Sequence, residues 1–167
     1  ALFTFEPTDR SLSFLPWAHS FGQTCELHGL LSMGSSMAIN DEIPNLVGNL
    51  ADVKPTILYA VPRIFNRIYD GVNKQMAERG GVVKSLFETG IAAAAKKNDG
   101  QSIGMMEGFQ LWLADTLVFS KVRARFGGRL KYAISGSAAL NRDVAKFIDA
   151  LGIVVFEGSA TTETSPI

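Results

Sequence analysis

The chain has 167 residues, of which 47% are apolar and 19% charged, and its formal net charge is zero. This length and composition are typical of a soluble globular protein with one core. The balanced charge gives no basic surface of the kind that binds nucleic acid. A single cysteine, Cys25, excludes an internal disulfide. No apolar run approaches the roughly 20 residues that span a bilayer, so we expect a cytoplasmic protein.

The N-terminal part of the chain predicts strands that alternate with helices. Alternating or β-branched runs bounded by Pro and Gly predict short strands at 11–15, 36–39 and 56–60. Apolar residues at helical spacing predict the intervening helices at 19–33 and 42–53. Asp41 is the expected N-cap of the second helix, because its carboxylate can accept from unpaired backbone N–H groups.

The remainder is helical from about 62 to 126 and then returns to alternation. Helices are expected at 62–79, 82–97 and about 109–126, with a linker at 98–102 and a stop at Gly127-Gly128. Strands at 130–135 and 153–156 enclose a helix that Asn141 caps. The sequence therefore predicts an α/β fold with a mostly parallel sheet, flanking helices and a helical insertion, within one domain over 1–167.

Three predicted strands are followed by segments that carry chemistry. They are residues 16–20, with His19; residues 136–140, which are mostly small; and residues 157–166, rich in hydroxyls and carboxylates. Ligands of open parallel sheets bind beyond the carboxyl ends of the strands, so we expect the three segments to form one site. That set suits a nucleotide with bound magnesium better than covalent catalysis.

Each segment alone has a structural explanation. The small residues from Ser135 to Ala138 are typical of a tight strand-to-helix turn, and a lone histidine near a helix start often caps or packs. Residues 161–164 are also compatible with an N-cap and capping box. The order and spacing of all three segments together favour a site.

In these segments the chain resembles the adenylate-forming enzymes, in particular the long-chain fatty acyl-CoA synthetases, from about residue 11 to 166. The resemblance rests on Leu-Pro-Trp-Ala-His-Ser-Phe-Gly at 15–22, Lys-Pro-Thr at 54–56, Val-Pro-Arg-Ile-Phe at 61–65, the run at 128–140, Glu-Gly at 157–158 and Thr-Glu-Thr-Ser-Pro at 162–166. The Val-Pro-Arg block favours the long-chain branch.

The resemblance implies an ATP-dependent acid–thiol ligase that uses ATP, Mg²⁺ and coenzyme A. A fatty carboxylate would attack the α-phosphate of ATP to give an acyl-adenylate and pyrophosphate, and the thiol of coenzyme A would then displace AMP. Catalysis would rest on positioning and charge neutralisation.

The resemblance also implies residue roles. The Thr162 hydroxyl would contact the α-phosphate, the Glu163 carboxylate would hold Mg²⁺, and His19 would lie near the reacting carboxylate. The nucleotide-binding residues would be Gly136, Ser137, Ala138, Glu157, Gly158, Ser159, Ala160, Thr161 and Thr162.

One departure from the family pattern concerns adenine. Relatives usually carry Tyr-Gly where this chain has Ser159-Ala160. An aromatic ring stacked on a base contributes roughly 1–3 kcal/mol, so we expect adenine affinity to fall by about one to two decades.

The resemblance further implies that the chain is an internal fragment of a larger N-terminal domain and is inactive alone, because the family's phosphate loop would precede Ala1 and its catalytic lysine would follow Ile167. The alternative is a catalytically silent fatty-acid-binding domain. A dinucleotide-binding domain is disfavoured, since no Gly-x-Gly-x-x-Gly follows a predicted strand. Fatty acid, ATP and coenzyme A are the expected partners, nucleic acid is not, and peripheral contact with the inner face of a membrane stays open.

Overall fold

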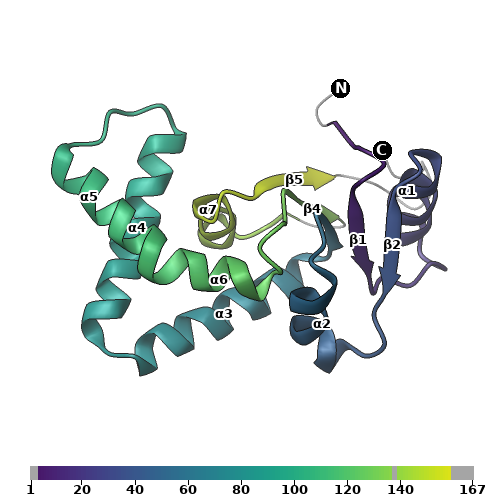
Figure 1. Cartoon of the computed structure of the whole chain (residues 1–167), viewed down its shortest axis with the longest axis horizontal. Helices are drawn as coiled ribbons and strands as arrows, with labels where there is room; N and C mark the ends of the chain where they lie inside the picture. The colour runs from purple at the N-terminus through teal and green to yellow at the C-terminus, as the bar shows by residue number, and fades with distance from the viewer. Residues whose placement is uncertain (1–3, 137–138, 159–167) are drawn as a thin grey trace.

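The computed structural model describes residues 4–136 and 139–158. In this part of the chain five parallel strands form one sheet in the order β2-β1-β3-β4-β5 (Figure 1). The strands are β1 Arg10–Ser13, β2 Ser36–Ile39, β3 Ile57–Ala60, β4 Tyr132–Gly136 and β5 Val154–Gly158. The predicted parallel α/β class is therefore confirmed.

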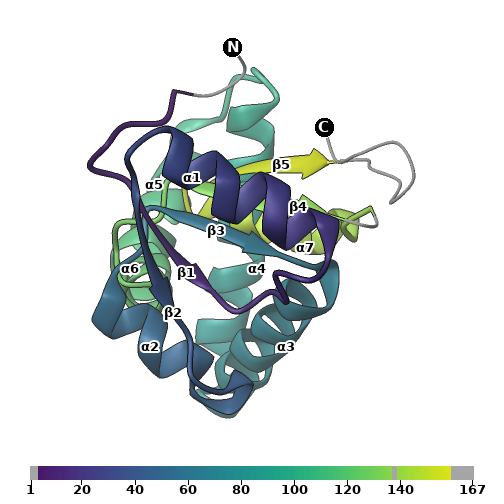
Figure 2. The same ribbon diagram turned by 90° about the vertical axis from the view of Figure 1, so that its right-hand side faces the viewer.

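Helices cover both faces of the sheet (Figure 2). The π-helical turn η1 (Phe21–His28) and α1 (Gly29–Ser32) pack on one face, in a small core with Ile57 and Tyr59 of β3. The other face carries α2 (Leu46–Val53), α3 (Pro62–Glu78) and α7 (Arg142–Ala150), which share the larger core. The alternation of side chains along a strand sends neighbouring residues into the two different cores.

The segment between β3 and β4 is helical. After α3 come α4 (Gly81–Asn98), α5 (Met105–Ala114), η3 (Asp115–Phe119) and α6 (Ser120–Arg125), and α4 and α5 extend away from the sheet in Figure 1. α5 exposes four large apolar side chains, Met105, Met106, Phe109 and Trp112. Within residues 4–136 and 139–158, no helix combines the length and apolarity needed to cross a bilayer.

Two helix starts differ from expectation and one agrees. The Asp41 cap is wrong: a 3-10 turn, η2 (Ile43–Asn45), precedes α2, and the Asp41 carboxylate accepts from the adjacent Glu42 N–H and from the Asn45 and Asn49 amides. The helix expected from about residue 109 begins at Met105, because the Glu107 carboxylate accepts from the Gly104 N–H at 3.1 Å. The Asn141 cap is confirmed, since its side chain accepts from the Asp143 N–H at 2.8 Å.

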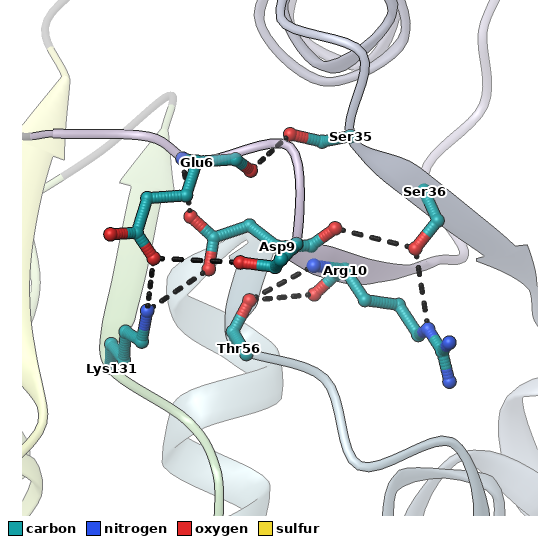
Figure 3. A network of polar contacts seen from close by, with 8 residues as sticks. Glu6, Asp9, Arg10, Ser35, Ser36, Thr56 and Lys131 are labelled. Carbon is teal, nitrogen blue, oxygen red and sulfur yellow. Dashed lines mark hydrogen bonds and ion pairs between the residues drawn. The ribbon is translucent and has the colours of Figure 1, made fainter.

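The amino ends of the strands are joined by a polar network (Figure 3). The buried Asp9 carboxylate accepts from the Glu6 N–H at 2.9 Å and pairs with Lys131 at 3.3 Å. Burial acts to raise the pKa of Asp9, but hydrogen bonds from Glu6, Thr56 and Lys131 outweigh it, and the pKa is lowered. The Thr56 N–H donates to Arg10 O, and the Lys131 N–H donates to Thr56 O, both at 2.8 Å. The network therefore ties β1, β3 and β4 together at one end.

The turn between α6 and β4 yields a prediction. Gly127 and Gly128 both have positive φ, +86° and +73°, so alanine at either costs about 1–2 kcal/mol. A β carbon at Gly127 would also lie 2.5 Å from Lys54 Cα and 2.6 Å from Leu50 O, whereas a β carbon at Gly128 would meet no atom of the described residues within 4 Å apart from its chain neighbours. In urea unfolding, Gly127→Ala should therefore cost about 1–3 kcal/mol more than the matched Gly128→Ala. Equal losses would contradict this packing.

Candidate functional site

The strand order places a topological switch point between β1 and β3. The chain moves from β1 outward to β2 on one side, and from β3 through β4 to β5 on the other. In this type of open sheet, ligands bind outside the carboxyl ends of the strands at such a point. β1 and β3 pair only at Ser11 and Ile57, whereas β3 and β4 pair from Ile57 to Ala60. The carboxyl end between β1 and β3 is thus the expected ligand position.

The segment after β1 is folded tightly onto the start of η1. The His19 N–H donates to Pro16 O at 3.0 Å, and His19 Nδ1 accepts from the Phe21 N–H at 3.3 Å. A β carbon at Gly22 would lie 2.9 Å from the same Pro16 carbonyl oxygen. The His19 side chain is exposed. An exposed imidazole therefore stands beside the switch point, on a backbone that is fixed on both sides.

Two glycines allow close packing at the ends of β4 and β5. A β carbon at Gly136, the last residue of β4, would come within 2.5–2.7 Å of three atoms of the Phe21 ring. Gly136 is also paired in register with Gly158, the last residue of β5. The end of β4 therefore contacts Phe21, at the start of η1, on one side and the end of β5 on the other.

Of two polar side chains at this edge, one has a hydrogen-bond partner and the other has none among the described residues. The Ser135 hydroxyl is fully buried and has no hydrogen-bond partner among the described residues. The Glu157 carboxylate accepts from the Leu140 N–H at 3.0 Å, which joins the segment after β4 to β5. A buried hydroxyl without a partner is costly, so Ser135 is a candidate for contact with a ligand or with neighbouring chain.

The structure describes four of the predicted site residues, His19, Gly136, Glu157 and Gly158. The other predicted residues, which are Ser137, Ala138, Ser159, Ala160, Thr161, Thr162 and Glu163, lie outside the described residues. Their closeness to His19 stays a prediction, as does magnesium at Glu163. Among the residues described, no group of three or more His, Cys, Asp and Glu side chains could hold a metal ion.

A buried carboxyl group at the switch point was not predicted. Glu26 of η1 is completely buried and accepts from the Ser11 hydroxyl at 3.0 Å and the Ser13 hydroxyl at 2.9 Å. Burial raises the pKa of Glu26 to about 7, although these two hydrogen bonds act to lower it. The sequence held a signal, because alternation along β1 puts both serines on one face, opposite the single acidic residue of the apolar helix.

A sizeable apolar cavity lies elsewhere. It has a volume of about 420 Å³ and lies between η2, α2, α3 and α6, on the sheet face opposite η1. Arg67 and Arg125 are its charged lining residues, and most of the others are apolar. None of the four described site residues, His19, Gly136, Glu157 and Gly158, lines this cavity.

Comparison with known proteins gives the family. The family described as AMP-binding enzyme matches residues 1–167. Long chain acyl-CoA synthetase 8 of Arabidopsis thaliana is 32% identical over 169 residues, covering 95% of this chain and 23% of that protein. The peroxisomal long chain acyl-CoA synthetase 7 of the same plant is 35% identical over 162 residues, covering 96% and 22%. The chain belongs to the AMP-binding enzyme family and spans less than a quarter of these relatives' length.

The fold agrees with a solved structure of this kind. The A domain of a carboxylic acid reductase from Segniliparus rugosus, in complex with AMP and a co-purified carboxylic acid, aligns with a TM-score of 0.66. The alignment covers 95% of this chain and 21% of that one, at 22% identity. At this identity the likeness establishes the fold.

Glu26 yields a prediction for stability. Its pKa is 4.5 in an unfolded chain and about 7 when folded, so between these values the folded state holds a proton that the unfolded state has lost. Stability should therefore fall as pH rises through this window, by about 3 kcal/mol from Glu26. Urea unfolding at several pH values should show this loss, and Glu26→Gln should remove it. The exposed Glu78→Gln is the control, and an unchanged slope in Glu26→Gln would refute the assignment.

The contact of Gly136 with Phe21 yields a second prediction. Gly136→Ala should destabilise the protein by about 1–3 kcal/mol, because the new methyl group overlaps a packed ring. Gly158→Ala is the matched control at the paired position, where the nearest atom would be 3.9 Å away. Its effect should stay below about 1 kcal/mol. Thermal or urea unfolding distinguishes the two, and a harmless Gly136→Ala would disprove the contact.

Proposed function

We propose that the full-length protein carrying this chain is an ATP-dependent ligase that activates a fatty acid as its acyl-adenylate and transfers the acyl group to coenzyme A. The observation that supports the proposal is that η1 lies against the ends of β4 and β5 at the carboxyl edge, where Phe21 contacts Gly136 and Gly136 pairs with Gly158. This is where parallel α/β sheets bind nucleotides. The names of the two plant relatives give the acyl-CoA synthetase reaction.

The chemistry follows from bringing an anionic carboxylate to an anionic phosphate. Small residues after β4 allow a flat adenine ring to approach the backbone, and the buried Ser135 hydroxyl can donate a hydrogen bond there. His19 is exposed on a fixed backbone, which suits contact with the acid. The Thr162 hydroxyl would contact the α-phosphate. No protein nucleophile is needed, since positioning and charge neutralisation lower the barrier.

The donor set at residues 157–163 is chemically suited to magnesium. Glu163 would hold the ion, since hard cations prefer carboxylate oxygen, and the bound ion would neutralise phosphate charge. The co-purified acid and the AMP in the bacterial reductase domain support an acid site beside a nucleotide site in this fold. Cytoplasmic location and peripheral membrane contact stay predictions.

A second candidate is a silent fatty-acid-binding protein derived from the same family. Two observations favour it: the absence of an aromatic ring at Ser159, and the apolar cavity of about 420 Å³ with two arginines. Cavities of this size hold small ligands, and an arginine beside an apolar lining suits a fatty carboxylate. In this candidate, fatty acid binds and ATP with magnesium does not.

The adenine contact gives a test of the main proposal. In the full-length protein, the double variant Ser159→Tyr/Ala160→Gly should lower the KM for ATP in pyrophosphate exchange by about ten- to a hundredfold, because the ring can stack on adenine. The single variants separate ring stacking from the effect of the added glycine. The KM for the fatty acid should not change.

Two outcomes would count against this assignment. An unchanged KM for ATP would mean that residues 159–160 do not contact adenine. If both the parent and the double variant bind fatty acid but not ATP, the protein is a silent fatty-acid-binding protein and the ligase proposal is wrong.

A further inference from the structure

Glu26 lies on η1, beside the strand that ends at the switch point. Its two oxygens are held by Ser11 and Ser13, which point from β1 toward the helix. Among the residues that the structure describes, no lysine, arginine or histidine forms an ion pair with it. A carboxyl group buried without a cation is expensive to ionise, so it is not explained as an ordinary structural ion pair.

The hydrogen bonds continue from Glu26 to the segment that carries His19. Ser13 Oγ donates to Glu26 Oε2 and accepts from the Trp17 indole N–H at 3.1 Å. Trp17 is 37% exposed and stands two residues before His19. Resting on the proposed function, we propose that Glu26 is a positioning residue that acts through Ser13 and Trp17 to hold His19 at the acid-binding edge.

The donors and acceptors show which charge state supports this arrangement. An ionised Glu26 accepts from both serine hydroxyls, so the Ser13 hydrogen points to Glu26 and its lone pairs stay available to Trp17. When Glu26 binds a proton, one oxygen becomes a donor, and the facing serine must turn its own hydrogen away. If that serine is Ser13, both of its lone pairs are then used, by Glu26 and by the Trp17 indole, and its hydrogen loses the Glu26 acceptor. Ionised Glu26 therefore fixes the segment best.

Two other titratable groups lie beside Glu26, and neither is charged near neutral pH. Tyr59 of β3 interacts electrostatically with Glu26, and the burial of Tyr59 together with that interaction raises the pKa of the phenol. Cys25 neighbours Glu26 on the same helix, and burial raises the pKa of its thiol. Both groups are neutral when Glu26 ionises, so Glu26 is the group whose charge changes near neutral pH.

The two serines give a matched pair of variants. Both are buried and both donate to Glu26, but only Ser13 connects it to Trp17. In this chain, the Trp17 indole N–H resonance should shift as pH rises through about 7, with the exposed Trp112 as the internal reference. The shift should vanish in Ser13→Ala and in Glu26→Gln, and persist in Ser11→Ala. His19 is present in every variant, so a shift that survives in Glu26→Gln would overturn the proposal.

The second measurement uses the full-length ligase. Ser13→Ala should lower kcat/KM for the fatty acid about tenfold, because the positioning of His19 is lost. The KM for ATP should stay constant in this variant. Ser11→Ala should change kcat/KM for the fatty acid and the KM for ATP by less than about twofold. In Glu26→Gln the rise of kcat/KM through pH 7 should disappear. Equal losses in the two serine variants would overturn the positioning role. A Trp17 response without any ligase activity would refute the proposed function, and the hydrogen-bonded link would stand.

Discussion

The common direction of the five strands is the constraint on which the arrangement depends. Because β1 to β5 are all parallel, every segment that follows a strand begins at the same edge of the sheet. The opposite edge is tied together by backbone bonds from Arg10 through Thr56 to Lys131 and by the Asp9 carboxylate (Figure 3). Ion pairing and hydrogen bonds therefore hold the amino ends of the strands together, and the polar segments that follow the strands lie at the carboxyl ends.

The two edges of the sheet also differ in the pKa of a buried carboxyl group near β1. Asp9 precedes the strand and has Lys131 as a partner, and its pKa is lowered. Glu26 lies on the helix that packs on the same strand and has only hydroxyl donors, and its pKa is raised to about 7. The paired group stabilises structure at all ordinary pH values. The unpaired group can change its charge near neutrality, where an enzyme works, and its bonds lead to the segment of His19.

The sequence could predict much of this because the relevant signals are local. Gly34, Pro55 and Gly127 end elements as expected, and Asn141 caps α7, whereas β1 ends at Ser13, before Pro16. Asp41 misled the prediction because its carboxylate accepts from the adjacent Glu42 N–H and from the Asn45 and Asn49 side chains, and not from the backbone donors of the α2 start. The early start of α5 depends on Glu107 reaching back to Gly104. The motif segments after β1, β4 and β5 were found from the sequence, and the family to which they pointed matches residues 1–167.

By itself, the sequence determined the parallel α/β class, the family and the segments that carry polar chemistry, because periodicity, capping and motif spacing are properties of neighbouring residues. Only the tertiary structure decided that β1 lies between β2 and β3, that the Phe21 ring occupies the place of a side chain at Gly136, and that Glu26 is buried against Ser11 and Ser13. These facts depend on contacts between residues distant in the chain. The pKa of a carboxyl group follows from such contacts, because burial and hydrogen bonding set the free energy of its charge.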